Sequence, residues 1–142
     1  WGLAKAAELN GVPGPVHLLE MKTEIGLSAD QVERIENLYE EMRQAAIPLG
    51  HDLIAGEREL NAAFAGGTIT ERRLGELLER IAQVRMKLRF VHLSAHLKTP
   101  DIVRPDQIAR YNRLRGYASD DPCANVPKGH DPAMWKKHHG CP

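Results

Sequence analysis

The chain has 142 residues, of which 42% are hydrophobic and only 5% aromatic, and its 19 basic and 19 acidic side chains cancel to a formal net charge of zero. This balance lacks the basic face that binds nucleic acids or anionic membranes, so we expect no nucleic-acid partner. The length suits one domain, and no apolar run approaches the ~20 residues that span a bilayer.

The first part of the chain predicts an arm and a short helix. Residues 1–14 end in NGVPGP, whose glycine and proline content predicts a flexible arm without a stable helix. Pro15 can open a short helix that Gly26 ends. Ser28 and Gln31 then have the capping-box spacing, which predicts the start of a new helix.

Two long amphipathic helices follow, because apolar residues recur at steps of three and four over 32–64 and again over 74–95. The sequence AGGT at 65–68 predicts a turn between them, and Thr68 with Glu71 offers a capping box for the second helix. Antiparallel packing about this turn would make a long helical hairpin.

One narrow apolar stripe on each helix cannot bury a core by itself, so we expect short helices and a second copy of the chain to cover the hairpin in a homodimer. Pro48 is expected to kink the first long helix. A last short helix begins at Pro105 and stops at Gly116. The expected organisation is a flexible arm over 1–14, a helical domain over 15–117 and a polar tail over 118–142.

A set of metal-ligating side chains can converge near the open end of the predicted hairpin. It combines a histidine pair four residues apart, two glutamates of the facing helix, and a histidine and a methionine of the short first helix. These candidate ligands are His17, Met21, Glu36, Glu40, His92 and His96. Together their donors suit nickel, cobalt, zinc or copper(II). The alternative is that these histidines and glutamates are surface residues and that the methionine fills the core.

The tail holds both cysteines, Cys123 and Cys141, in a stretch rich in histidine. Asp131, followed by proline, predicts a helix start, after which a histidine and a methionine step by four along one side. The residues concerned are His130, Met134 and His138, with His139 beside them. We predict a disulfide, worth ~3 kcal/mol of local order, with the histidines exposed and available for metal. The alternative is a soft copper(I) site that also uses thiolate.

The motif LSADQ at 27–31 resembles the LTxxQ motif of the Spy/CpxP superfamily of bacterial periplasmic proteins, and VRPDQ at 103–107 matches it more loosely. The order of short helix, motif, long hairpin, motif and short helix over 15–117 is also similar. The resemblance implies an all-helical, cradle-shaped, antiparallel homodimer in the periplasm. The chain begins at Trp1 without an initiator methionine, so we expect that a leader or anchor has been removed.

Members of this superfamily have two kinds of activity. CnrX-like and ZraP-like members respond to metals, and for them the resemblance points by position to the same histidines and methionine and to either Glu36 or Glu40. It implies a metal-binding or metal-sensing protein of the heavy-metal stress response, with a membrane-bound signalling protein as partner. Spy-like members are instead chaperones that hold unfolded clients without ATP. No phosphate-binding loop, nucleophile elbow or HExxH motif occurs, which indicates a non-enzyme.

Overall fold

The structure is a computed structural model that describes residues 2–117, 123, 126 and 130–141. Within these residues the chain is all-helical, as predicted, and has no strand. None of the described helices is both long and apolar enough to cross a membrane. The helices are α1 (Lys5–Glu8), α2 (Pro15–Glu20), α3 (Ala29–Ala65), α4 (Glu71–Lys98), the short 3-10 helix η1 (Thr99–Asp101), α5 (Pro105–Arg115) and α6 (Pro132–His138).

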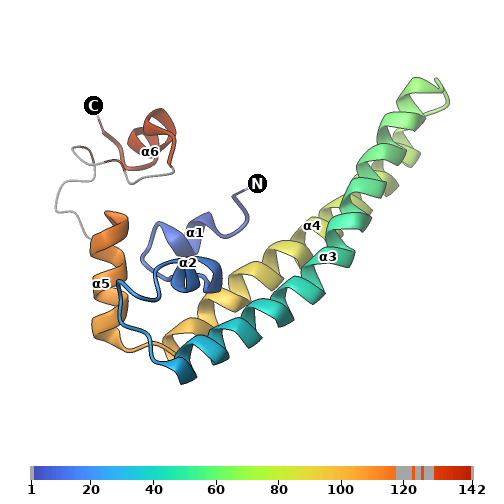
Figure 1. The fold of residues 1–142 in the computed structure, drawn as a ribbon. Coiled ribbons are helices and arrows are strands. Elements are labelled where there is room, and N and C mark those ends of the chain that lie inside the picture. The colour runs from blue at the N-terminus through green and yellow to red at the C-terminus, as the bar shows by residue number, and fades with distance from the viewer. Residues whose placement is uncertain (1, 118–122, 124–125, 127–129, 142) are drawn as a thin grey trace.

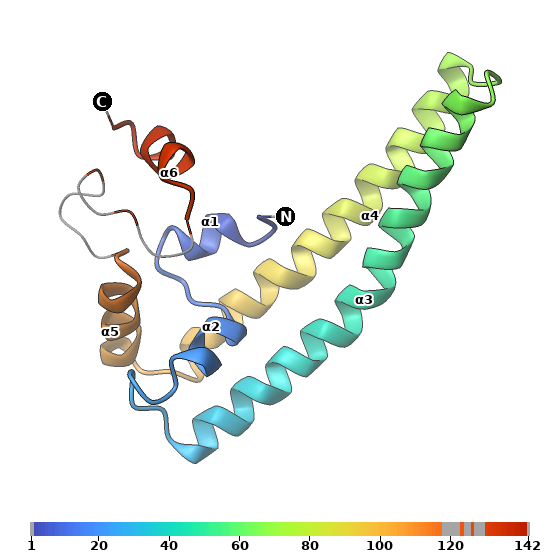
Figure 2. The ribbon, with the colours of Figure 1, turned by 45° about the horizontal axis from the view of Figure 1, so that its top comes forward.

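α3 and α4 lie side by side and project as a long pair away from the shorter helices (Figures 1 and 2). α3 begins at the predicted capping box, in which Ser28 Oγ accepts from Gln31 N at 3.2 Å and Gln31 Oε1 accepts from Ser28 N at 3.0 Å. Pro48 lies inside α3, which continues through it as one helix. The pair curves along its length in Figure 1.

The second long helix begins at a different threonine from the one predicted. Thr70 is its N-cap, because the Thr70 hydroxyl accepts a hydrogen bond from Arg73 N at 3.2 Å. The capping box expected from Thr68 and Glu71 is therefore wrong. Gly67 has a φ of +64°, a left-handed conformation that glycine adopts at low cost. The turn continues past Gly67, so α4 begins only after Thr70.

The N-terminal arm packs against the helical domain. Its residues 5–8 form the one-turn helix α1, so the prediction that glycine and proline exclude a helix in this arm was wrong. Residues 3–10 contain no glycine and no proline, so nothing in this part of the arm prevents a helical turn. After α1, the Pro13 carbonyl accepts from Thr99 Oγ1 at 2.8 Å and the Gly11 carbonyl accepts from Asn112 Nδ2 at 3.1 Å. The arm is thereby tied to the end of α4 and to α5.

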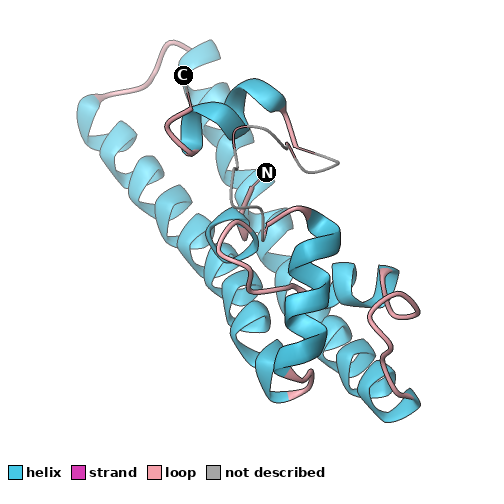
Figure 3. Ribbon diagram, turned by 90° about the vertical axis from the view of Figure 1, so that its left-hand side faces the viewer, coloured by secondary structure: helices cyan, strands magenta, loops and turns pink. Residues whose placement is uncertain are grey.

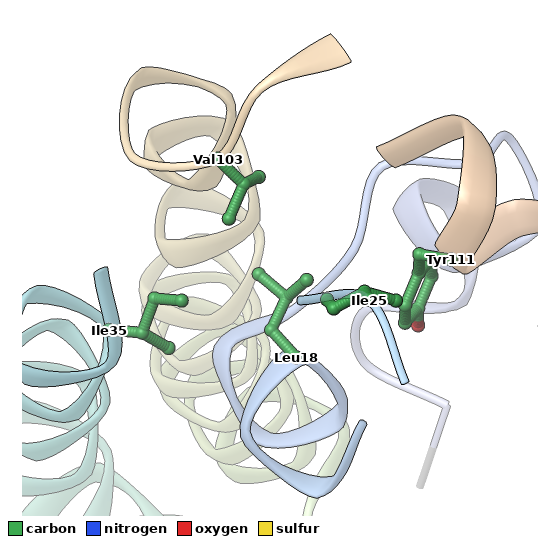
Figure 4. Packing of buried hydrophobic residues seen from close by; sticks show 5 residues of the cluster. All are labelled: Leu18, Ile25, Ile35, Val103 and Tyr111. Atoms are coloured by element: carbon green, nitrogen blue, oxygen red, sulfur yellow. The ribbon is translucent and has the colours of Figure 1, made fainter. Parts of the chain in front are cut away.

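The larger apolar core lies where α2 and α5 meet the base of the long pair. Figure 4 shows Leu18 of α2 at its centre, between Ile35 of α3 and Ile25, with Tyr111 of α5 beyond. Leu18, Ile35 and Tyr111 are each 0% exposed. Burying an aliphatic side chain of this size stabilises the fold by roughly 1.5–3 kcal/mol, so this core holds the short helices in place. Figure 3 shows that loops occur mainly at the connections between helices.

A second core runs between the long helices and is made by Leu53, Ile81 and Leu88. Within it, Gly56 of α3 faces Ile81 of α4 so closely that an added Cβ would lie 2.9 Å from Ile81 Cγ1. The glycine at this position therefore lets the two helices approach each other.

α5 begins at the second motif. The Gln107 side chain is buried, and its Oε1 accepts from Arg104 N at 2.9 Å, which satisfies one free N–H of the helix start. Its amide nitrogen donates to the Gly26 carbonyl at 2.9 Å. Half of the capping geometry is thus kept although arginine stands where the motif has threonine.

Candidate functional site

A pocket of about 490 Å³ lies between α1, α2 and the long pair. Its walls come from the N-terminal arm, α2, α3, α4, the end of α5 and the tail. Four of the seven histidines of the chain line it, namely His17, His92, His96 and His130. Glu8 and Met42 add an oxygen donor and a sulfur donor to the same lining.

His96 is the most buried of the predicted metal-binding histidines, with 6% of the residue exposed. Its Nδ1 lies 2.8 Å from the Val12 carbonyl oxygen. Because a carbonyl only accepts hydrogen bonds, Nδ1 carries the hydrogen, and the neutral ring has its lone pair on Nε2. Gly14 lies against this edge of the ring, where an added Cβ would be 2.6 Å from Nε2.

His17 and His92 are oriented in the same way. His17 Nδ1 lies 2.9 Å from the Glu20 carboxylate, and His92 Nδ1 lies 2.9 Å from the Leu88 carbonyl of its own helix. Both partners are acceptors, so in the neutral rings Nε2 again has the lone pair. Three histidines from α2 and α4 therefore share one tautomer and one pocket.

Glu8 lies between two of these rings. Its Oε1 is 3.8 Å from His17 Nε2 and 3.9 Å from His96 Nε2. Its Oε2 accepts from the Tyr111 hydroxyl at 3.1 Å and from the Tyr117 hydroxyl at 3.3 Å. Burial is the main cause that raises the pKa of both tyrosines, so they stay hydrogen-bond donors at neutral pH.

The tail contributes His130 and an aromatic cluster. His130 Nε2 lies 3.0 Å from the Tyr117 hydroxyl, and burial lowers the pKa of His130, with Arg115 and Lys5 acting in the same direction. Trp135 of α6 is 4% exposed and its ring centroid lies 6.2 Å from that of Tyr117. The tail therefore docks on the end of α5.

The other predicted tail residues lie apart from the pocket lining. Asp131 starts α6 as predicted, with its carboxylate accepting from Met134 N at 2.9 Å. Met134 is 56% exposed, and the ring centroid of His139 lies 4.0 Å from that of Trp135 and 5.0 Å from that of His138. Cys123 and Cys141 are joined in a disulfide, with their Cα atoms 5.5 Å apart.

Three of the predicted ligands are not brought to the pocket. Met21 packs against the core around Leu18. Glu36 is exposed on α3. Glu40 accepts hydrogen bonds from Arg43 at 2.9 and 3.1 Å, and these bonds are the main cause that lowers its pKa.

Sequence reasoning missed Glu8 and Met42. Met42 belongs to the predicted apolar stripe of the first long helix, a place that favours a core role, and Glu8 lies in the arm that was expected to be flexible. The donor types around the pocket fit a borderline divalent metal ion. As they stand, however, no three His, Cys, Asp or Glu side chains among the described residues are arranged to hold a metal ion.

Comparison with protein-family models, curated proteins and solved structures finds no match for this chain.

Proposed function

We propose that this protein binds a divalent transition-metal ion through the histidines of the pocket, as a metal-binding or metal-sensing protein rather than an enzyme. One observation carries the proposal: His17, His92 and His96 all have Nδ1 against an acceptor. Metal-ligating histidines are oriented in this way, because the second-shell acceptor fixes the tautomer and raises the basicity of the other nitrogen. Imidazole donors with one carboxylate suit nickel, cobalt, zinc or copper(II).

The periplasm is the proposed location. The disulfide between Cys123 and Cys141 supports an oxidising compartment, where such bonds form and persist. Kinship with the Spy/CpxP superfamily is supported by the motif glutamines, since Gln31 Oε1 and Gln107 Oε1 each accept from the backbone N–H three residues earlier. In a sensing role, the partner would be a membrane-bound signalling protein.

Equilibrium dialysis against nickel, cobalt, zinc and copper(II) tests the metal proposal. We expect binding at micromolar concentration or tighter, weakened at least tenfold by the double change His92→Ala and His96→Ala. His51→Ala is the matched control, because His51 is an exposed histidine of α3 away from the pocket. The proposal fails if the wild-type chain binds no metal in this range, or if the double variant binds as the wild type does.

We also propose that α3 and α4 form the hairpin of a cradle-shaped, antiparallel homodimer. The support is a series of exposed apolar side chains along the pair, namely Ile47, Ile54, Phe64, Leu78, Met86 and Phe90. A second copy would cover part of this surface. Light scattering at micromolar concentration should give twice the chain mass, and Phe90→Glu should reduce it to that of one chain. A wild-type monomer would contradict this arrangement.

The alternative function is an ATP-independent chaperone for unfolded clients. Exposed apolar side chains of α4 favour it, because Phe90 is 67% exposed and Leu97 is 72% exposed. A stoichiometric amount of the protein should then suppress aggregation of a reduced client, with or without metal. Full aggregation of the client in both conditions would exclude this alternative.

A further inference from the structure

The carboxylate of Glu8 is held by one oxygen and presents the other to the pocket. Oε2 accepts hydrogen bonds from the hydroxyls of Tyr111 and Tyr117 at 3.1 and 3.3 Å. Arg115 Nη2 lies 4.0 Å from the same oxygen. The Glu8 side chain is 12% exposed, so most of it is removed from water. Oε1 is thus the oxygen that is left for a partner inside the pocket.

The neighbours of Oε1 are hydrogen-bond acceptors. His17 Nε2 and His96 Nε2 lie 3.8 and 3.9 Å away, which is beyond hydrogen-bonding distance. Each ring has its Nδ1 against an acceptor, so in the neutral ring Nε2 has the lone pair. Within the described part of the chain, no group donates a hydrogen bond to Oε1. One carboxylate oxygen and two imidazole nitrogens therefore favour a cationic ligand with several N–H bonds.

A primary ammonium group has these properties, because it carries one positive charge and three N–H donors. With charge-assisted hydrogen bonds of about 2.8 Å, its nitrogen would see Oε1 and either Nε2 at an angle of roughly 85–90°. The N–H bonds of the ammonium are about 109° apart, so each hydrogen bond bends by roughly 10°, which is well within good geometry. An ammonium can therefore bridge Oε1 to either ring at the distances that the structure has.

The rest of the pocket suits an apolar body attached to that group. Leu3, Val16 and Met42 contribute apolar side chains to the lining. The volume of about 490 Å³ is typical of small-molecule sites, which span roughly 300–1,000 Å³. Lys5 also lines the pocket and carries the same charge as an ammonium. The ligand must therefore be recognised by its N–H bonds and its apolar body, and not by its charge alone.

We propose that the pocket binds a small organic amine, as a primary ammonium ion with an aliphatic or aromatic body. Its N–H bonds are donated to Glu8 Oε1 and to Nε2 of His17 and His96. The inference goes beyond the proposed metal-binding function, since no metal ion takes part in it. A metal ion and an amine would compete for the same imidazole nitrogens. The N-terminal arm, which carries Glu8, is part of this binding site.

The test uses 2-phenylethylammonium as the probe, titrated into the full chain and followed by the NMR signals of the backbone amides. EDTA is present, so the result does not depend on the metal-binding test. The pH is 8, where unperturbed imidazole is neutral and an alkylammonium ion stays charged. We expect a dissociation constant in the millimolar range or lower. The N,N,N-trimethyl form keeps the charge and the ring but has no N–H bond, and it should bind at least tenfold more weakly. Equal binding of the two ions, or no binding of the primary amine in this range, would overturn the proposal.

Three variants test the assignment of Glu8. Glu8→Gln keeps the length of the side chain and an acceptor for the tyrosines, and it should weaken binding of the primary amine at least tenfold. Glu40→Gln is the matched control and should stay within twofold of the wild type, because Glu40 binds Arg43 and does not line the pocket. Lys5→Gln removes a like charge and should bind the amine at least as tightly as the wild type. Wild-type binding by Glu8→Gln, or loss of binding in Lys5→Gln, would contradict the assignment.

A further measurement needs no variant and so does not depend on how Glu8→Gln folds. In the wild-type chain, the ring protons of the bound probe should show intermolecular NOEs to the methyl groups of Leu3, Val16 and Met42. If the NOEs go instead to exposed apolar side chains of the long pair, such as Phe90, the amine binds elsewhere and the proposal fails.

Discussion

Gln31 and Gln107 hydrogen-bond each other through both ends of their side-chain amides. Gln31 Nε2 donates to Gln107 Oε1 at 2.8 Å, and Gln107 Nε2 donates to Gln31 Oε1 at 3.0 Å. Each oxygen also accepts the backbone N–H of the residue three positions before its own glutamine, which is Ser28 for Gln31 and Arg104 for Gln107. One side chain from each motif therefore caps its own helix and joins α3 to α5.

The first prediction concerns this buried pair. Gln107→Ala should lower the free energy of unfolding by about 1–3 kcal/mol, because it removes the two hydrogen bonds to Gln31 and leaves the Gly26 carbonyl without its Gln107 donor. Denaturant unfolding followed by circular dichroism measures the change. Gln83→Ala, at an exposed site of α4, is the control and should alter stability by less than about 0.5 kcal/mol. Equal effects of the two changes would argue against a structural role for the pair.

The second prediction concerns Gly14. Its φ of −90° and ψ of 160° suit any residue, so the glycine serves to leave room for the His96 ring. Gly14→Ala should displace this ring, weaken metal binding at least tenfold and cost about 1–3 kcal/mol of stability. Gly75→Ala, with no atom within 4 Å of its added Cβ, should leave metal binding unchanged. Dialysis and thermal unfolding of both variants check this, and unaltered binding by Gly14→Ala would refute it.

The third prediction compares two glycines of α3. Gly50→Ala meets no atom within 4 Å and should stabilise the protein by about 0.5–1 kcal/mol through helix propensity. Gly56→Ala places its Cβ 2.9 Å from Ile81 Cγ1, so the clash should outweigh this gain and cost about 1–3 kcal/mol. The cost should largely disappear in an Ile81→Ala background, because the two changes are coupled. Denaturant unfolding gives the three values, and simple additivity would contradict the expected contact.

The fourth prediction concerns the disulfide, which joins residues 18 positions apart. Replacing both cysteines by serine should destabilise the folded tail by roughly 3 kcal/mol, because the bridge no longer limits the entropy of the unfolded loop. Hydrogen exchange should become faster at His139 N and Cys141 N, which donate to Trp135 and Lys136 in α6. Amides in the middle of α4 should keep their rates. Thiol titration of the unreduced wild type should find no free cysteine, and two reactive thiols would disprove the bridge.

Much of the fold could be predicted because its signals are local. The three- and four-residue spacing of apolar side chains marks both long helices, and the capping box at Ser28 marks the start of α3. The error at Thr68 arose because two threonines flank the same turn, and only the backbone path decides which of them caps α4.

The site could be predicted only in part. His92 and His96 share a helical face, and the short helix places His17 near them, so a common pocket followed from spacing. The spacing of residues in the sequence did not predict how α3 is rotated about its axis. In the structure this rotation turns Glu40 outward, where it binds Arg43. Glu8 was missed because the arm is held by Tyr111, more than a hundred positions along the chain.

The pocket takes its walls from positions as far apart as Gly2 and His130. A ligand that binds only when these walls are assembled stabilises the assembled state by mass action. At a hundred times its dissociation constant, the ligand contributes about 2.7 kcal/mol to the stability of that state. Sites in the arm and in the tail would then become resistant to a protease together, although they are distant in sequence. The rate of limited proteolysis near either end of the chain would therefore report how much of the pocket is occupied.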